Sequence, residues 1–338
     1  MVRQLLISFL FIASSHSAFG QAVTLARESL DYFEHHTFPL CRESIESTIS
    51  DFCKQELNSD KSSGKSLIHK LEKESSHFQN HKVPNAHGSL PTEYTRFLQA
   101  LIDYTSKCSN LKSEIQADSI LIVRAKILEC HKSVLNAATR LEQEVSVYCI
   151  ENQLTRTEDG SRIAILFRDA QKRLEYLHGI QSYLIPVIKM ETTCLESILK
   201  DSIHTSEKRR AEFSKLVEIN NVNLKNHSAC CGDHLVKNAA LNSLRLFSIE
   251  ARNEIVHIIK FIAAEQDFIA HHQKVKNAST ESELEKQAYR NAVRKYNEDI
   301  KGANELVTNL EKNRKDHLSA FYSAQIKFLE TWLKDFQE

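Results

Sequence analysis

Eight cysteines carry most of the chemistry that this sequence could perform. They lie at Cys41, Cys53, Cys108, Cys130, Cys149, Cys194, Cys230 and Cys231. An even number of cysteines in a secreted chain predicts a disulfide framework, whereas cysteines in a reducing compartment are more typical of metal binding or catalysis. The chemistry expected of them therefore depends on where the protein resides.

The first 20 residues have the features of a secretory signal peptide. Arg3 precedes an apolar run from Leu5 to Ala13, and small residues follow at Ala18 and Gly20. A cation, an apolar segment and small residues in this order predict cleavage before Gln21. We therefore expect a secreted, extracellular protein whose eight cysteines form disulfides.

Helix geometry limits how these cysteines can pair. Bridged residues have Cα atoms within about 7 Å. A continuous helix would separate Cys41 from Cys53 by about 18 Å, so each must reach another helix. If the chain reverses near Asp118 and Ser119, Cys108 and Cys130 face each other across a helical hairpin. We expect a disulfide between Cys108 and Cys130.

Cys230 and Cys231 are adjacent in the sequence. Vicinal disulfides are strained, so each cysteine is expected to pair with a different partner among Cys41, Cys53, Cys149 and Cys194. A redox or metal site at the vicinal pair is the alternative, since His234 lies four residues from Cys230. An oxidised Cys230 could not bind a metal, and the sequence contains none of the CxxC spacing typical of structural zinc sites.

Other residue types give no motif for catalysis. The histidine doublets His35–His36 and His271–His272 are poor chelates, because adjacent side chains on a helix point about 100° apart. The sequence has no HExxH or GxSxG motif, and its glycines are too few for a phosphate loop. We expect no catalytic residue, no cofactor and no metal site, and hence a protein that is not an enzyme.

Two sequons predict glycosylation. Asn226 begins Asn-His-Ser and Asn277 begins Asn-Ala-Ser. Both fall in polar segments, 220–228 and 277–280, that we expect to be exposed loops. The protein is therefore predicted to be a glycoprotein.

The elements that position these residues are predicted to be long helices. The chain of 338 residues has only 7 Gly and 4 Pro, whereas sheets and loops use turn residues heavily. From Ile120 to Tyr148, apolar residues recur at every third or fourth position, as on one face of a helix. Similar stripes run from Ile163 to Ile188 and from Leu241 to Ile269.

The last segment has a heptad pattern typical of coiled-coil packing. Its apolar positions are Tyr289, Val293, Tyr296, Ile300, Ala303, Val307 and Leu310, followed after a lapse at Arg314 and His317 by Phe321, Ala324 and Phe328. The predicted fold class is all-α: an elongated bundle of long antiparallel amphipathic helices, cross-linked by disulfides, with a coiled-coil-like C-terminal helix.

Breaks in these patterns predict the domain organisation. After the signal peptide (1–20), residues 21–90 are expected to form an N-terminal helical arm, and residues 91–338 the main helical bundle. The segment from Gln79 to Pro91 holds two of the four prolines and is the predicted linker. Pro186 interrupts a helical stripe and is expected to kink or end its helix.

Charge and hydropathy exclude two classes of partner. With 44 basic and 44 acidic residues the net charge is zero, which argues against nucleic acid, since a nucleic-acid-binding protein needs a cationic face. The best apolar run after the signal peptide, Ile255 to Ala264, is interrupted by His257 and Lys260 and is too short to be a transmembrane segment.

We therefore expect a secreted, non-enzymatic helical interaction protein that binds an extracellular protein partner, such as a receptor or an immune or haemostatic component. The alternative is a carrier of a small apolar ligand within the bundle, with a cavity where Ala239, Ala240, Ala263 and Ala264 lie. The heptad pattern also allows self-association through the C-terminal helix.

Overall fold

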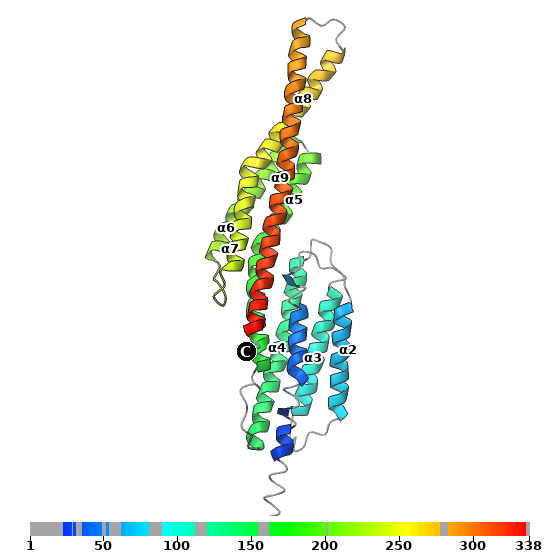
Figure 1. Cartoon of the computed structure of the whole chain (residues 1–338), viewed down its shortest axis with the longest axis vertical. Coiled ribbons are helices and arrows are strands. Elements are labelled where there is room, and N and C mark those ends of the chain that lie inside the picture. The colour runs from blue at the N-terminus through cyan, green and yellow to red at the C-terminus, as the bar shows by residue number, and fades with distance from the viewer. Residues whose placement is uncertain are drawn as a thin grey trace, which may run out of the picture. The chain divides into compact units, whose positions relative to one another are not determined.

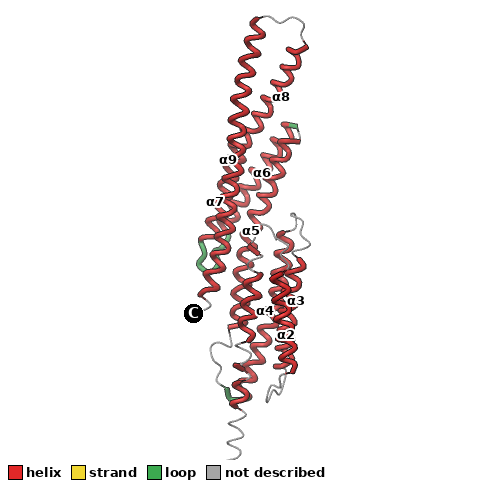
Figure 2. The backbone as a smooth tube through the Cα atoms, turned by 45° about the vertical axis from the view of Figure 1, so that its right-hand side comes forward, coloured by secondary structure: helices red, strands yellow, loops and turns green. Residues whose placement is uncertain are grey.

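The all-α fold is confirmed in the described part of the chain. The computed structural model describes residues 23–28, 30–31, 36–48, 52–53, 62–80, 90–111, 120–154, 162–200, 202–277 and 283–335. Nearly all of these residues are helical and none of them lies in a strand (Figures 1 and 2). The predicted signal peptide, residues 1–20, lies outside the described residues.

Long helices account for most of the chain. The labelled elements are α2 (Ser62–Asn80), α3 (Leu90–Leu111), α4 (Ile120–Glu151), α5 (Arg162–Lys200), α6 (Ile203–Asn226), α7 (Leu235–Ile249), the π-helix η3 (Glu250–Glu254), α8 (Ile255–Asn277) and α9 (Glu283–Asp335). Helix α4 carries the stripe predicted from Ile120 to Tyr148. Helix α9 alone contains 53 residues and carries the predicted heptad pattern on both sides of its lapse at Arg314 and His317.

The chain divides into two compact units. The first contains Met1–Glu175 and Trp332–Glu338, and the second contains Tyr176–Thr331. The division falls inside α5, so this helix contributes to both units. The predicted boundary near residue 90 lies beside residues 81–89, which the structure does not describe, and α2 and α3 pack against each other within the first unit.

In the first unit, α3 packs against both α2 and α4 (Figure 1). Phe97, Leu98 and Leu101 of α3 are fully buried, as are Val134 of α4 and Phe167 of α5. The packing of α3 on α4 is the helical hairpin that the sequence predicted on either side of Asp118 and Ser119, although those two residues lie outside the described part.

His131 is buried at the centre of this unit. Its Nε2 lies 2.9 Å from the carbonyl oxygen of Phe167, which can only accept, so Nε2 carries the proton. Its Nδ1 then accepts from the hydroxyl of Tyr104, 3.3 Å away. Burial disfavours the charged imidazolium and lowers the pKa of His131 to about 4.

In the second unit, α5 and α9 run antiparallel. Three pairs of side chains meet along them, and as the residue number rises on α5 it falls on α9. The rings of Tyr176 and Phe328 have centroids 5.8 Å apart. The amides of Gln181 and Gln325 lie 2.5 Å apart, and Glu191 lies 3.3 Å from Arg314.

Helices α6, α7 and α8 complete the second unit. Phe213 of α6 meets Phe247 of α7 edge to face, with ring centroids 6.2 Å apart. Arg210 of α6 donates to the carbonyl oxygen of Ala251 in η3, 3.2 Å away. These contacts place the π-helix, and therefore the start of α8, against α6.

Two local predictions of where helices end are corrected. Helix α5 does not end at Pro186 but continues through it, because Leu184 and Val187 on either side are fully buried and their packing offsets the lost hydrogen bond. The predicted loop at 220–228 is helical as far as Asn226, since Leu224 is fully buried on the inner face of α6.

We predict that the first unit loses stability in acid through His131. The ordinary pKa of this group is 6.5 and the folded value is about 4, so between these values the unfolded chain takes up a proton that the folded protein does not. Stability should therefore fall as pH falls from about 6.5 to about 4, by on the order of 3 kcal/mol. Urea unfolding across this pH range measures the slope.

His131→Gln is the comparison variant, because its amide can still donate to Phe167 but does not titrate in this range. It should be less stable than the wild type at neutral pH and show a shallower loss in acid. An unchanged acid slope in this variant would contradict the assignment.

Candidate functional site

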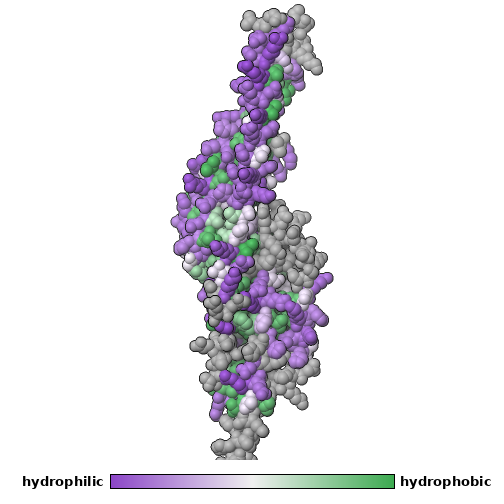
Figure 3. All heavy atoms as spheres, in the orientation of Figure 1, coloured by the Kyte–Doolittle hydropathy of each residue, from purple (hydrophilic) through white to green (hydrophobic). Residues whose placement is uncertain are grey.

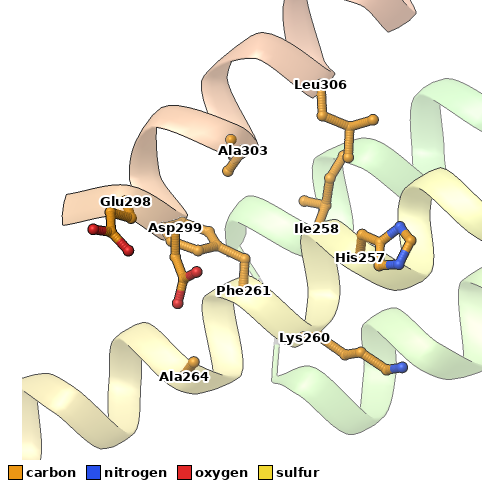
Figure 4. A pocket seen from close by; sticks show the side chains of 10 residues that line it. His257, Ile258, Lys260, Phe261, Ala264, Glu298, Asp299, Ala303 and Leu306 are labelled. Carbon is orange, nitrogen blue, oxygen red and sulfur yellow. The ribbon is translucent and has the colours of Figure 1, made fainter. Parts of the chain in front are cut away.

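An open groove lies between α8 and α9 in the second unit (Figure 4). Its volume is about 460 Å³. The lining residues from α8 are His257, Ile258, Lys260, Phe261 and Ala264, and those from α9 are Glu298, Asp299, Gly302, Ala303 and Leu306. Both helices contribute small residues here, which leaves space between them.

The groove has an apolar floor and charged rims. Ile258 is buried, and Phe261 and Leu306 are half-buried between the two helices. The cationic rim belongs to α8, where Lys260 is exposed, and the acidic rim belongs to α9, where Glu298 and Asp299 are exposed. An occupant would therefore need an apolar face flanked by charges.

Gly302 of α9 lines the groove and is exposed. A Cβ atom built on this residue meets no other atom within 4 Å, so the space beside it is free. A larger side chain at this position would enter the groove without displacing the protein's own atoms.

A stack of aromatic rings holds α8 against α9 on one side of the groove. Phe268 and Tyr296 lie nearly parallel with centroids 4.5 Å apart, and Phe261 stacks on the same tyrosine at 6.3 Å. The hydroxyl of Tyr296 donates to Glu265 over 2.6 Å. The heptad pattern had already marked Tyr296 as a position that faces a neighbouring helix. The apolar stripe predicted for α8 was less accurate at its end, because its last residue, Ile269, is 46% exposed.

The visible surface of this helical hairpin is mostly hydrophilic, with a narrow hydrophobic strip (Figure 3). Several seam positions of α9 are partly uncovered. Ile300 and Ala303 are only half-buried and Val307 is 42% exposed, whereas Leu310 further along the same seam is buried. Part of the predicted seam is therefore left uncovered beside the groove.

The alanines expected to line an enclosed cavity do not come together. Ala264 is exposed and lines the groove. Ala240 is fully buried in the core, and Ala239 and Ala263 are half-buried positions that do not line the groove.

A buried pair of carboxyl groups lies elsewhere in the second unit. Glu191 of α5 and Glu250 of η3 are each 1% exposed and are hydrogen-bonded to each other. The Nε of Arg314 lies 3.3 Å from Oε2 of Glu191. The π-helix places Glu250 in this site. The backbone N–H of Ile255 donates to the carbonyl oxygen of Glu250, five residues earlier, and the side chains of both Glu250 and Ala251 are buried.

These two carboxyl groups share a proton at neutral pH. Burial, followed by the charge of Glu191 and the hydrogen bond to it, raises the pKa of Glu250 from 4.5 to about 9. Burial also raises the pKa of Glu191, but Arg314 and the proton on Glu250 oppose that rise. Glu250 therefore holds the proton in the folded protein and donates it to Glu191.

The structure does not support the predicted disulfide framework. It describes all eight cysteines and bonds none of them to another, including the predicted pair Cys108 and Cys130. Cys41, Cys53 and Cys194 are fully buried, Cys108 and Cys149 nearly so, and Cys130 is half-buried. Burial raises the pKa of Cys53 and of Cys194 to about 12, so these thiols stay protonated and pack as small apolar side chains.

The remaining predicted site residues lie near helix ends. Asn226 is exposed at the last position of α6, where a glycan would have access to solvent. Asn277 is the last residue of α8, and its side chain lies outside the described part. Cys230 and Cys231 lie in the loop between α6 and α7, where Cys231 is exposed.

Within the described residues, no group of three or more His, Cys, Asp or Glu side chains is arranged to hold a metal ion. No described helix combines the length and apolar character that a membrane span requires.

Comparison of the chain with models of protein families, with curated proteins and with solved structures gives no match.

We predict that Glu250→Gln makes the second unit more stable at alkaline pH. Between its ordinary pKa of 4.5 and its folded pKa of about 9, Glu250 holds a proton in the folded state that the unfolded chain has released. Stability conferred by this proton is therefore lost as pH rises. The neutral glutamine should remove this slope and gain about 2 kcal/mol near pH 8, as measured by chemical unfolding.

Glu254→Gln is the matched control, because Glu254 lies on the same π-helix but is only half-buried. Its effect on the pH slope should be much smaller. Equal slopes in the wild type and in Glu250→Gln would show that the two carboxyl groups do not share a proton.

Proposed function

We propose that this chain is a secreted, non-enzymatic interaction protein that binds a helical segment of an extracellular protein partner. The observation that carries the proposal is the groove between α8 and α9, with its apolar floor and oppositely charged rims. A groove between two helices accepts a third, amphipathic helix, whose apolar residues fill the floor.

The seam of α9 supports a helical occupant. Ala303 lines the groove, Val307 on the same heptad seam is 42% exposed, and Leu310 is covered within the protein. Coiled-coil seams are completed by a partner helix that covers such positions. The coiled-coil packing expected of α9 is therefore proposed for the complex, with the partner supplying the missing helix.

The charged rims indicate what the partner would carry. Acidic residues on one edge of its helix would face Lys260, and basic residues on the other edge would face Glu298 and Asp299. Rim charges of this kind contribute to orientation and specificity more than to affinity. They would fix the direction in which the partner helix lies.

The carrier function remains the second candidate, because 460 Å³ lies within the range of small-molecule sites. Native mass spectrometry of the mature protein from its natural source distinguishes the two. A bound apolar molecule, lost on mild activation, would favour the carrier. A ligand-free mass that begins at Gln21, with glycans on Asn226 and Asn277, would agree with the secreted interaction protein.

We predict that Gly302→Leu abolishes partner binding while leaving the protein folded. The leucine side chain would occupy the free space of the groove, and glycine is the less favourable residue inside a helix by about 1 kcal/mol. Gly302→Ala is the matched control, since it gains the same helix stability but fills little of the groove.

Binding is measured by photo-crosslinking from a reactive residue placed at Leu306 in the groove, with Lys301 as an exposed position outside it. A helical peptide of a second protein should be captured from Leu306 only. Its capture should fall at least about tenfold in Gly302→Leu and persist in Gly302→Ala. Crosslinks between copies of this chain would instead identify self-association through α9, and equal capture in both variants would contradict the proposal.

A further inference from the structure

The loop between α6 and α7 brings two adjacent thiols together at the surface. Cys231 is exposed and Cys230 is half-buried, and their Sγ atoms lie 2.7 Å apart. A disulfide needs about 2.05 Å between the sulfur atoms, so a movement of less than about 1 Å would bring them to bonding distance.

The backbone of this loop has an unusual conformation. The φ angles of Cys231 and Gly232 are +58° and +74°, and the N–H of Asp233 donates to the carbonyl of Cys230 over 2.9 Å. Positive φ at both central residues of such a turn is typical of type I′. Left-handed backbone is unfavourable for a cysteine, so its surroundings must hold it there.

Downstream of the cysteines, Asp233 anchors the turn to two helices. Its carboxylate accepts from the N–H groups of Leu235 and Val236, at 2.9 Å and 3.2 Å, in the first turn of α7. The hydroxyl of Tyr176 on α5 donates to the same carboxylate over 3.0 Å. Burial and this negative charge raise the pKa of Tyr176, so its hydroxyl keeps the proton that it donates.

Upstream of the cysteines, His227 anchors the loop. Its ring stacks on Tyr176 with centroids 5.6 Å apart and lies so close to Gly179 that a Cβ there would be 2.8 Å from it. The ammonium of Lys237 donates to the carbonyl oxygens of Lys225 and His227, at 2.9 Å and 2.6 Å. Both ends of the loop are therefore fixed.

We propose that Cys230 and Cys231 are a redox modification site that closes reversibly into a vicinal disulfide by exchange with a low-molecular-weight disulfide. This replaces the expectation that each cysteine bridges to a distant helix. The site is separate from the groove and does not depend on the proposed function.

The exchange has two balanced steps. The thiolate of exposed Cys231 attacks one sulfur of the small disulfide, forms a mixed disulfide and expels one thiolate. The thiolate of Cys230 then attacks the Cys231 sulfur, which forms the Cys230–Cys231 bond and expels the second thiolate. The two protons lost by the cysteines end on the two small thiols, so the protein is oxidised by two electrons and the small disulfide is reduced.

Burial gives this site its selectivity. Cys41, Cys53 and Cys194 are fully buried, and a buried thiol reacts slowly because the reactive thiolate is disfavoured. Cys130 is half-buried, so a Cys130→Ser background removes the thiol most able to compete in the folded protein.

The test equilibrates reduced, folded Cys130→Ser protein with glutathione and glutathione disulfide, traps free thiols with iodoacetamide, and maps peptides by mass spectrometry. The peptide containing both cysteines should carry an internal disulfide and no alkyl group, and reducing agent should restore both thiols. In Cys230→Ser, Cys231 should instead retain a mixed disulfide with glutathione.

A synthetic peptide spanning residues 227–234 is the control for the folded loop. Because the loop is held at both ends, the protein should close at least about tenfold more readily than the peptide at the same glutathione ratio. Equal closure in protein and peptide, two separate glutathione adducts, or full alkylation of both thiols would each overturn the proposal.

Discussion

Two carboxyl groups that must share a buried site with one proton determine how the second unit is assembled. Glu191, Glu250 and Arg314 come from three different elements, α5, η3 and α9, and each is needed to satisfy the others. A buried charge that loses its partner is strongly destabilising, so the three elements cannot slide past one another. The π-helix is part of the same constraint, because it turns Glu250 inwards next to Ala251 before α8 begins. The start of the α8–α9 groove is therefore positioned by a polar contact rather than by apolar packing alone.

Much of the helical architecture could be predicted from the sequence, because the buried face of an amphipathic helix places an apolar residue at every third or fourth position. The stripe from Ile120 to Tyr148 is the inner face of α4, and the scarcity of glycine matches a chain with few turns. The last heptad pattern lapses at Arg314 because this position is not apolar. The arginine nevertheless occupies the seam, where it meets Glu191. A search for periodic apolar residues takes only apolar side chains into account, so it does not detect a polar residue that faces the core. Glu191 and Glu250 were missed for the same reason.

The cysteines show where compositional reasoning fails. An even count in a chain with a predicted signal peptide indicates bridges, yet a chain of this size can bury enough apolar surface without them. In the structure, most of the cysteines fill the core as small apolar side chains. The adjacent pair differs because a loop anchored through Asp233 and His227 presents it to solvent. Nothing in the order of residues from Asn220 to Ser228 shows that His227 packs over Gly179, since that contact joins a loop to helix α5, far away in the sequence.

Helix α9 also limits how the length of this chain can vary. Tyr296 meets a partner on α8, whereas Arg314 and Gln325 meet partners on α5, yet all three lie on one uninterrupted helix. One inserted residue rotates everything beyond it by about 100°, so an insertion between Tyr296 and Gln325 would turn the later side chains away from their partners. An insertion of a whole number of helical turns would restore the direction of the later side chains, but it would shift them along the helix axis and away from their partners. Insertions and deletions should therefore be confined to the connections between helices, where no single register has to serve several neighbours.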